Sequence, residues 1–238
     1  MEFEIAMLVV FIFSIVQSVI GVGLLVFGTP TFLLLGYSFE VTVAYLLPAS
    51  IGISCMQILH GKEHIKLRKD FLIFTVPFIM FGLALVLTER NAFDMKMIVG
   101  LMLIVTGVIR LVPKLQKALK RILQKQMKLY LIGMGFIHGH SNMGGGLLTI
   151  LTSGLFDNKQ EIRVNIAYGY LIFALTQIIV VAILRPHLLK ADNLIFLATS
   201  LFTYLLLGNV IFHKSAEKTY QNFITVFTLA YGGVVVLI

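Results

Sequence analysis

The sequence predicts an all-α membrane protein with about eight transmembrane segments in two homologous four-segment repeats. Three observations predict this fold class. Hydrophobic residues make up 58% of the 238 residues and charged residues only 13%, whereas soluble domains average roughly 45–50% and about 25%. Long intervals without a charged residue recur along the whole chain. Short residue patterns also recur at offsets of 118–125 residues.

The composition excludes several classes of protein. A mean hydropathy of +0.96 excludes an ordinary soluble enzyme and a disordered chain, which needs low hydrophobicity. The only cysteine, Cys55, excludes an intramolecular disulfide and a cysteine-based zinc site. The net charge of +8 is concentrated, because seven basic and no acidic residues lie between Arg110 and Lys128. We therefore expect no nucleic-acid partner, no metal or other cofactor and no enzymatic activity.

The charge-free intervals define the candidate segments. A helix needs ~20 apolar residues to cross a bilayer, and most of the intervals have about this length, the short 97–109 being extended by its neighbours. Outer-membrane barrels show ~10-residue alternating segments instead. The intervals are 5–39, 41–61, 71–88, 97–109, 129–156, 164–184, 193–212 and 219–238.

Two intervals, 5–39 and 129–156, are too long for one straight helix. At ~1.5 Å per residue they would reach about 52 Å and about 42 Å, against a hydrocarbon core of roughly 30 Å. Both contain glycines near the middle, so we expect the first segment of each repeat to be a half-helix, a break and a second short helix. The residues that mark the breaks are Gly21, Gly23, Gly28 and Pro30 in the first interval and Gly139, Gly144, Gly145 and Gly146 in the second.

The recurring patterns divide the chain. The first repeat is expected at 1–112, a basic linker at 113–128 and the second repeat at 129–238. The linker has apolar residues at helical spacing, which predicts an amphipathic helix whose basic residues at 114–128 contact the anionic inner leaflet. Matching positions in the two halves include Gly36 and Gly154, Glu40 and Glu161, Gln57 and Gln177, and Asp70 and Asp192.

Basic loops predict the orientation. The loop 60–70 and the linker are separated by two spans, and the positive-inside rule places both in the cytoplasm. We therefore expect a multi-pass protein of the cytoplasmic membrane. Whether the first segment of each repeat crosses or re-enters stays open, and with it whether the repeats are parallel or inverted. The oligomeric state, a homodimer included, also stays open.

Polar residues beside the two breaks are the candidate substrate-binding site. A glycine break followed by a helix exposes backbone N–H groups at the positive end of that helix, which suits an oxyanion. Two breaks that face each other near the midplane would form one anion site. The candidates are Gln17, Ser18, Gly21, Gly23 and Thr29 at the first break and His138, His140, Ser141, Asn142, Gly144, Gly145 and Gly146 at the second.

The histidines admit more than one role. His138 and His140 are interpreted either as structural residues or as substrate contacts that carry a proton. A metal site is disfavoured because it needs three or four ligands. The pattern His60-Gly-Lys-Glu-His64 resembles a zinc-protease motif, but it contains a glycine and lies at the boundary of a span, so we treat it as a chance match.

Other polar residues receive structural interpretations. We expect Gln57 and Gln177 to hydrogen-bond between helices rather than to bind substrate. We expect the Arg163 side chain to extend toward the membrane surface. Tyr45 and Tyr168 are expected to be anchors at the membrane interface.

The glycine patterns also carry a resemblance. Gly-Phe-x-x-Gly…Gly-Gly-Gly at 135–146, Gly-x-Gly…Pro at 21–30 and the duplicated layout resemble the sulfite exporter TauE/SafE family. The resemblance implies secondary transport of a small sulfur-containing anion, such as sulfite, sulfoacetate or a related organosulfonate, and proton coupling is one mode to test. The alternative is a passive anion channel, or a permease for another small carboxylate or oxyanion.

Overall fold

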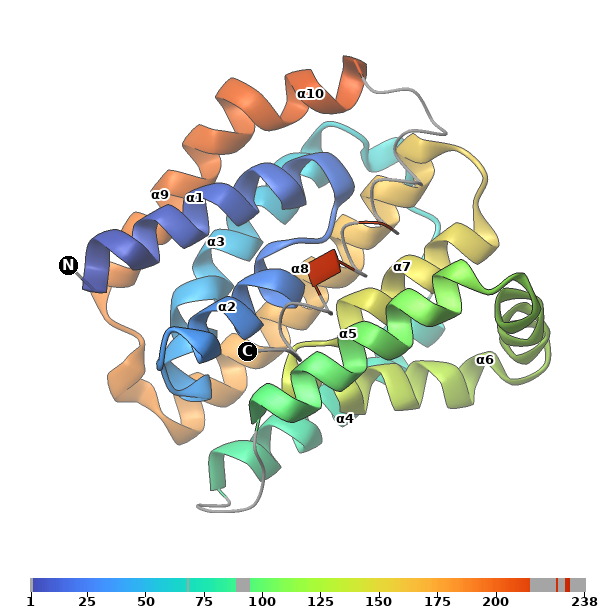
Figure 1. Ribbon diagram of the computed structural model, residues 1–238, viewed down its shortest axis with the longest axis horizontal. Helices are drawn as coiled ribbons and strands as arrows, with labels where there is room; N and C mark the ends of the chain where they lie inside the picture. The colour runs from blue at the N-terminus through green and yellow to red at the C-terminus, as the bar shows by residue number, and fades with distance from the viewer. Residues whose placement is uncertain (1, 68, 89–94, 215–225, 227–229, 232–238) are drawn as a thin grey trace.

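The chain forms a bundle of helices packed side by side (Figure 1). The computed structural model describes residues 2–67, 69–88, 95–214, 226, 230 and 231, and within these ranges every regular element is a helix. The longer helices are α1 (Glu2–Ile20), α3 (Phe39–Leu59), α4 (Lys69–Thr88), α5 (Met95–Leu111), α6 (Pro113–Ser141), α7 (Gly144–Leu155), α8 (Lys159–Leu184) and α9 (Leu194–Thr203). The short elements are η1 (Leu24–Gly28), α2 (Thr29–Leu34), η2 (Lys62–His64), η3 (Pro186–Leu188), η4 (Ala191–Asn193), η5 (Tyr204–Gly208) and α10 (Asn209–Lys214).

Among the described residues, five helical stretches are long and apolar enough to cross a membrane, and there is a sixth if one bent pair is counted as a span. The predictions of an all-α chain and of several membrane spans are therefore confirmed. The count of about eight segments stays a prediction, and most of the last expected segment, 219–238, lies outside the described residues. The five stretches are Phe3–Ile20, Phe39–Leu59, Lys69–Thr88, Lys159–Leu184 and Ala191–Phe212.

Helices α3 and α8 form an antiparallel pair at the centre of the bundle. Near the start of α3, the Glu40 carboxylate lies 3.4 Å from the Arg185 guanidinium, directly after α8. Near the start of α8, the Glu161 carboxylate lies 2.6 Å from the Lys66 ammonium, in the loop after α3. These contacts define two ends of the bundle, which we call the Arg185 end and the Lys66 end.

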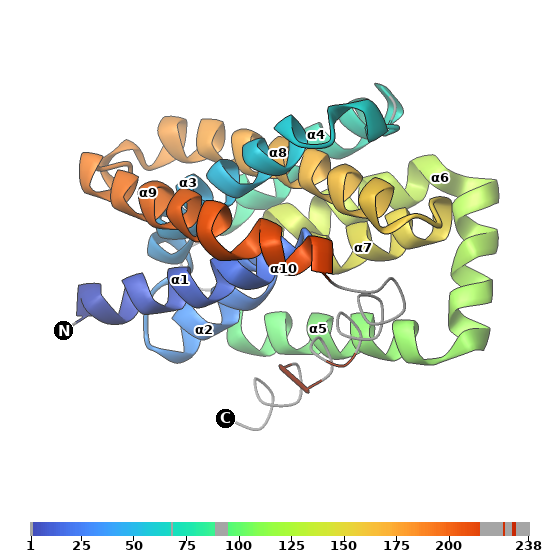
Figure 2. The same ribbon diagram turned by 90° about the horizontal axis from the view of Figure 1, so that it is seen from above.

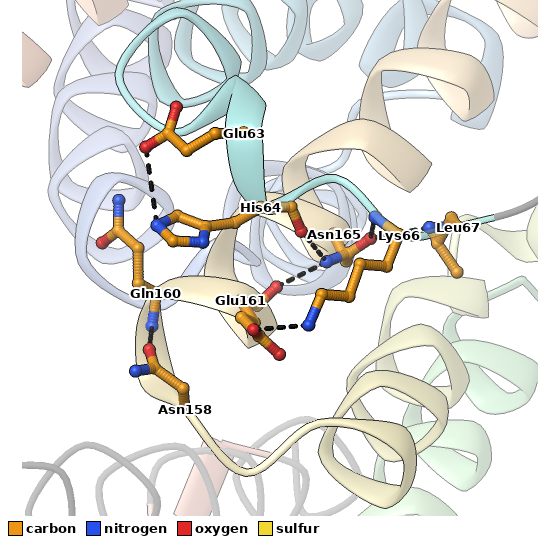
Figure 3. Close-up of polar contacts among 8 residues, drawn as sticks. All are labelled: Glu63, His64, Lys66, Leu67, Asn158, Gln160, Glu161 and Asn165. Carbon is orange, nitrogen blue, oxygen red and sulfur yellow. Dashed lines mark hydrogen bonds and ion pairs between the residues drawn. The ribbon is translucent and has the colours of Figure 1, made fainter.

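At the Lys66 end, the amide side chain of Asn165 joins the loop after α3 to α8 (Figure 3). Asn165 of α8 accepts hydrogen bonds at its Oδ1 from the backbone N–H groups of Lys66 (2.7 Å) and Leu67 (2.9 Å). Its Nδ2 donates to the carbonyl oxygens of His64 (2.9 Å) and Glu161 (2.8 Å). The loop after α3 is therefore fixed to α8 by backbone contacts in addition to the ion pair.

The first long segment is broken, as predicted, directly after α1. Gly21 has a φ of +90°, a conformation that glycine adopts without steric cost. The chain then reverses and returns through η1 and α2 to the start of α3, where the Phe32 and Tyr45 rings lie 6.1 Å apart. Gly28 and Pro30, which were expected to belong to the break, lie instead at the end of η1 and in the first turn of α2.

The second long segment is also broken, but not at its glycines. Helix α6 ends at Ser141, and Asn142 takes the left-handed conformation with a φ of 63°, which asparagine tolerates better than most residues. The three glycines 144–146 form the first turn of α7, and Gly139 lies inside α6. These glycines serve close packing: a Cβ on Gly139 would lie 2.2 Å from the Ile79 carbonyl oxygen of α4.

The basic linker is helical and turns away from its neighbours. Residues 113–123 make an angle of 98° with α5, and Gln126 has non-helical backbone angles where the chain turns again. Figure 2 shows this part of α6 as an upright limb at the right, between α5 and the rest of α6. A helical linker is thus observed, while its contact with a lipid surface stays a prediction.

Candidate functional site

A chain of polar side chains crosses the bundle at the second break. The Asn142 amide donates from Nδ2 to the Thr29 hydroxyl of α2 over 3.0 Å. The Gln177 amide of α8 donates from Nε2 to the Asn142 Oδ1 over 2.6 Å. The remaining amide oxygen of Gln177, Oε1, lies 3.3 Å from His138 Nε2. All four side chains are fully buried. The series of hydrogen bonds is therefore enclosed by protein and links α2, α6 and α8.

His138 lies at the inner end of this chain. Its ring stacks on Phe173, with the ring centroids 4.0 Å apart, and α7 packs directly against it because a Cβ on Gly144 would lie 2.4 Å from the His138 Cβ. Its second ring nitrogen, Nδ1, is buried and has no hydrogen-bond partner among the described residues. A buried polar atom without a partner is costly, so this nitrogen is a candidate ligand contact.

Helix α7 begins with three glycines against the His138 side chain, since a Cβ on Gly144 would lie 3.0 Å from His138 Cγ. The Met143 N–H donates to the Ser141 hydroxyl over 3.4 Å and the Gly146 N–H to the Met143 carbonyl oxygen over 3.3 Å, and no side chain caps the helix itself. The Tyr170 hydroxyl lies over the helix start, since a Cβ on Gly145 would fall 1.8 Å from Tyr170 Oη. This hydroxyl is fully buried and has no hydrogen-bond partner among the residues that the structure describes. The first N–H groups of a helix also lack intrahelical partners. Backbone donors, the Tyr170 hydroxyl and the His138 ring thus meet at one place.

The first break differs because the chain closes it with its own side chains. The Gln17 Oε1 accepts the Leu24 backbone N–H at the start of η1 over 3.1 Å, and the Gln17 Nε2 donates to Ser50 and Ser54 of α3. The Gln57 Nε2 donates to the Gln17 carbonyl oxygen over 2.8 Å. The first N–H group of η1 is therefore already bonded to a side chain, whereas no side chain among the described residues accepts from the N–H groups of Gly144 and Gly145 at the start of α7.

The structure distributes the sequence candidates over two breaks that lie against each other. Thr29 joins the second break, and Val26 of η1 packs on its glycines, because a Cβ on Gly145 would lie 2.7 Å from Val26 Cγ2. Gly21 packs against Ile166 of α8. Brought together at the second break are Thr29, His138, Asn142, Gly144, Gly145 and Gly146, whereas Gln17, Ser18, Gly21 and Gly23 belong to the first.

Two candidates of the polar cluster point elsewhere. His140 is two residues from His138 on the same helix, so its ring lies on another face, where it stacks on Phe136 at 5.9 Å. The Ser141 hydroxyl donates to the Ile137 carbonyl oxygen of its own helix over 2.8 Å. The same hydroxyl accepts the N–H of Met143, directly before α7, over 3.4 Å. The His140 ring is not part of the group that faces the start of α7.

The prediction missed or underrated three residues of α8 and misplaced a fourth. Gln177 was expected only to join helices, and it does so, but it also orients His138. Tyr170 and Phe173 were not singled out, because an aromatic residue in an apolar span looks like ordinary core. Arg163 was expected to extend toward the surface; instead it is 3% exposed, with its guanidinium 3.9 Å from the Phe212 ring centroid.

A cavity of about 410 Å³ lies at the Lys66 end between α4, α6 and α7. Its polar lining residues are Lys66 and Asp70, and the apolar ones include Leu151 and Leu155 of α7. The cavity therefore lies at the C-terminal end of α7, the helix whose N-terminal end belongs to the second break. Among the described residues, no group of three His, Cys, Asp or Glu side chains is placed to hold a metal ion.

Comparison with known proteins gives the family. A family model described as "Sulfite exporter TauE/SafE" matches residues 6–235, which is nearly the whole chain. No curated protein and no solved structure matches the chain. The match supports a multi-pass membrane protein that transports sulfite or related anions, in agreement with the apolar helices and the open helix start described above. The chain belongs to the sulfite exporter TauE/SafE family.

Proposed function

We propose that the chain is a secondary transporter that moves a small sulfur-containing anion, of the class of sulfite, sulfoacetate or a related organosulfonate, across the cytoplasmic membrane. The binding site is the start of α7. The observation that carries the proposal is the meeting of the N–H groups of Gly144 and Gly145, which no side chain caps, with the buried, unpartnered hydroxyl of Tyr170. Helix starts favour anions through free N–H groups and the helix dipole.

The chemistry of this site suits transport rather than permanent binding. Its donors are neutral: backbone N–H groups, a tyrosine hydroxyl and the polar side chains that surround them. A buried arginine at the same place would be costly whenever the site was empty and would slow release of the anion. Neutral donors in a low-dielectric interior stabilise a single negative charge without either penalty.

The two-repeat layout is part of the proposal, with the repeats at 1–112 and 129–238 inverted relative to each other. Equivalent features lie 119–121 residues apart in the two halves. They are the helix caps Ser38 and Asn158, the first-turn acids Glu40 and Glu161, their basic partners Lys66 and Arg185, and the positive-φ residues Gly21 and Asn142.

The ion pairs support inversion in particular. Each acid pairs with the basic residue that follows the other repeat's central helix. This exchange is what a two-fold axis in the membrane plane produces, because such an axis makes α3 and α8 antiparallel. Inverted repeats with broken helices are a common basis for alternating access. In this arrangement both broken segments re-enter from opposite ends.

The proposed orientation places the Lys66 end in the cytoplasm. Basic residues gather there in the 60–70 loop and in the linker 113–128, as the positive-inside rule requires. The contact between Leu123 and Gly154, where an added Cβ would lie 3.5 Å from the leucine, keeps the linker at that end. The linker's lysines then face the anionic inner leaflet, where each contributes about 1 kcal/mol to membrane contact.

The test is flux of radiolabelled sulfite into proteoliposomes. Gly145→Ala places a methyl group against Tyr170 Oη and should abolish flux, whereas Gly133→Ala, where no atom lies within 4 Å of the added Cβ, should retain it. Tyr170→Phe, which removes only the unpartnered hydroxyl, should raise the KM about tenfold. Saturable flux that responds to an imposed gradient supports a transporter. Linear, non-saturating flux contradicts it and favours a channel.

A further inference from the structure

The hydrogen-bond chain at the second break fixes which groups of the site donate and which accept. Asn142 donates from Nδ2 to Thr29, so its Oδ1 is free to accept from Gln177 Nε2. The Gln177 Oε1 that remains is an amide oxygen, which can only accept. With both amides in this orientation, His138 Nε2, 3.3 Å from that oxygen, carries the ring proton.

This assignment decides the chemistry of the other ring nitrogen. In a neutral imidazole one nitrogen donates and the other accepts, so a proton on Nε2 leaves Nδ1 as a bare acceptor. That atom is fully buried and has no partner among the described residues. The site therefore contains one unsatisfied acceptor, His138 Nδ1, together with three donors: the Tyr170 hydroxyl and the N–H groups of Gly144 and Gly145. The Gly146 N–H already donates to the Met143 carbonyl oxygen.

We propose that this site selects a monoanion that carries its own proton, and that the favoured substrate is hydrogensulfite rather than the sulfite dianion or a sulfonate. The inference rests on the proposed function. The oxygens of such an anion accept from the backbone and from Tyr170, while its O–H donates to His138 Nδ1. A sulfonate or a dianion can present only lone pairs to that nitrogen, which then stays buried and unpaired.

A consequence concerns proton coupling. Because the proton belongs to the substrate, it crosses the membrane with the anion, and His138 never needs to change its protonation state. The bound species has one negative charge, which the neutral donors of the site can stabilise. Coupling of the flux to the proton gradient then follows from the identity of the substrate, and no side chain acts as a proton carrier.

The test uses two ligands that differ only in the donor. Methanesulfinate has the charge of hydrogensulfite, and a methyl group replaces the hydroxyl. Purified protein in lipid nanodiscs is titrated with radiolabelled sulfite at a pH where the hydrogen anion predominates, and methanesulfinate is added as competitor. We expect methanesulfinate to bind about tenfold or more weakly than hydrogensulfite, because it leaves Nδ1 unpaired.

Two substitutions of His138 test whether its Nδ1 causes the preference for hydrogensulfite. His138→Gln retains a polar group near the Nε2 position and loses the acceptor near Nδ1, so the affinities for the two ligands should become similar. His138→Asn retains an acceptor near Nδ1 and should keep the preference for hydrogensulfite. The ligand comparison on the unchanged protein stands even where a variant does not fold.

The outcomes separate the two proposals. If sulfite binds and methanesulfinate competes equally well, selection of a protonated anion is wrong and the proposed anion site stands. If sulfite binds and the two histidine variants behave alike, Nδ1 is not the acceptor that selects. If the unchanged protein binds no sulfite, both proposals are overturned.

Discussion

The ammonium group of Lys66 lies 2.6 Å from the carboxylate of Glu161, so the loop after α3 meets the first turn of α8. The two side chains are 51% and 22% exposed, and exposed ion pairs contribute roughly 0–1 kcal/mol. Beneath them, Asn165 bonds the backbone of the same loop through three hydrogen bonds and the Glu161 carbonyl oxygen of its own helix through a fourth (Figure 3). The amide rather than the ion pair therefore stabilises this end of the bundle.

This difference predicts unequal effects of two substitutions. Asn165→Leu leaves the partly buried backbone N–H groups of Lys66 and Leu67 without their acceptor, at a combined cost of about 1–3 kcal/mol. Lys66→Met removes only the exposed pair and should cost about 1 kcal/mol or less. Thermal unfolding of the purified protein in detergent measures both variants. An equal loss of stability in the two would show that the ion pair, and not the amide, holds the loop.

A second prediction concerns the glycines of α6. Gly139→Ala drives a methyl group to 2.2 Å from the Ile79 carbonyl oxygen, and overpacking of this kind costs about 1–3 kcal/mol. Gly133→Ala, on the same helix with open space around it, should be neutral or stabilising by up to about 1 kcal/mol. The melting temperatures of the two variants check this. If Gly139→Ala has the same melting temperature as the unchanged protein, this glycine is not needed for the close packing of α4 on α6.

These two glycines show which part of the fold could be predicted from the sequence. The excess length of 5–39 and 129–156 predicted a break in each, and both breaks exist. Their positions were harder to predict, because glycine marks both reversals and close packing. At Gly21 the backbone needs a positive φ, while at Gly139 a neighbouring helix needs the space. Only the tertiary contacts distinguish these two reasons for a glycine.

The candidate site was predicted in part for a related reason. Polar residues such as His138 and Asn142 stand out in an apolar interval, so they were found. Tyr170 does not stand out in the sequence, because its role depends on the position of Gly145 across the bundle. The different roles of His138 and His140 follow from helix geometry, since residues two apart lie on different faces. The sequence alone did not tell which face is toward the core.

The third prediction separates the backbone of Asn142 from its side chain. Asn142→Gly keeps the left-handed conformation easily, whereas Asn142→Ala adds roughly 1–2 kcal/mol of backbone strain, so the alanine variant should melt at a lower temperature. Both variants free Gln177 from its partner and should reduce the preference for hydrogensulfite over methanesulfinate. Competition binding measures that preference. Unchanged selectivity in Asn142→Gly would show that the Asn142 side chain does not orient Gln177 and His138.

The last prediction decides between inverted and parallel repeats. It uses two lysines at opposite ends of the bundle: Lys117 in the linker, at the Lys66 end, and Lys190 in the loop after α8, at the Arg185 end. Each is replaced by cysteine in a Cys55→Ala background, and intact cells are treated with a thiol reagent that cannot cross the membrane. Inverted repeats place the two positions on opposite sides. If both broken segments crossed the membrane once instead, both positions would lie in the cytoplasm.

We expect Lys190→Cys to be labelled in intact cells and Lys117→Cys only after the membrane is permeabilised. The reason is the antiparallel contact of α3 with α8, which fixes Glu161 beside Lys66 and Glu40 beside Arg185, together with the basic residues that favour the cytoplasm for the Lys66 end. Protection of both cysteines in intact cells would contradict the inversion. Labelling of Lys117→Cys with protection of Lys190→Cys would keep the inversion and reverse the orientation. The ion pairs determine only that the two ends lie on opposite sides of the membrane. The charge of the loops determines which end is in the cytoplasm.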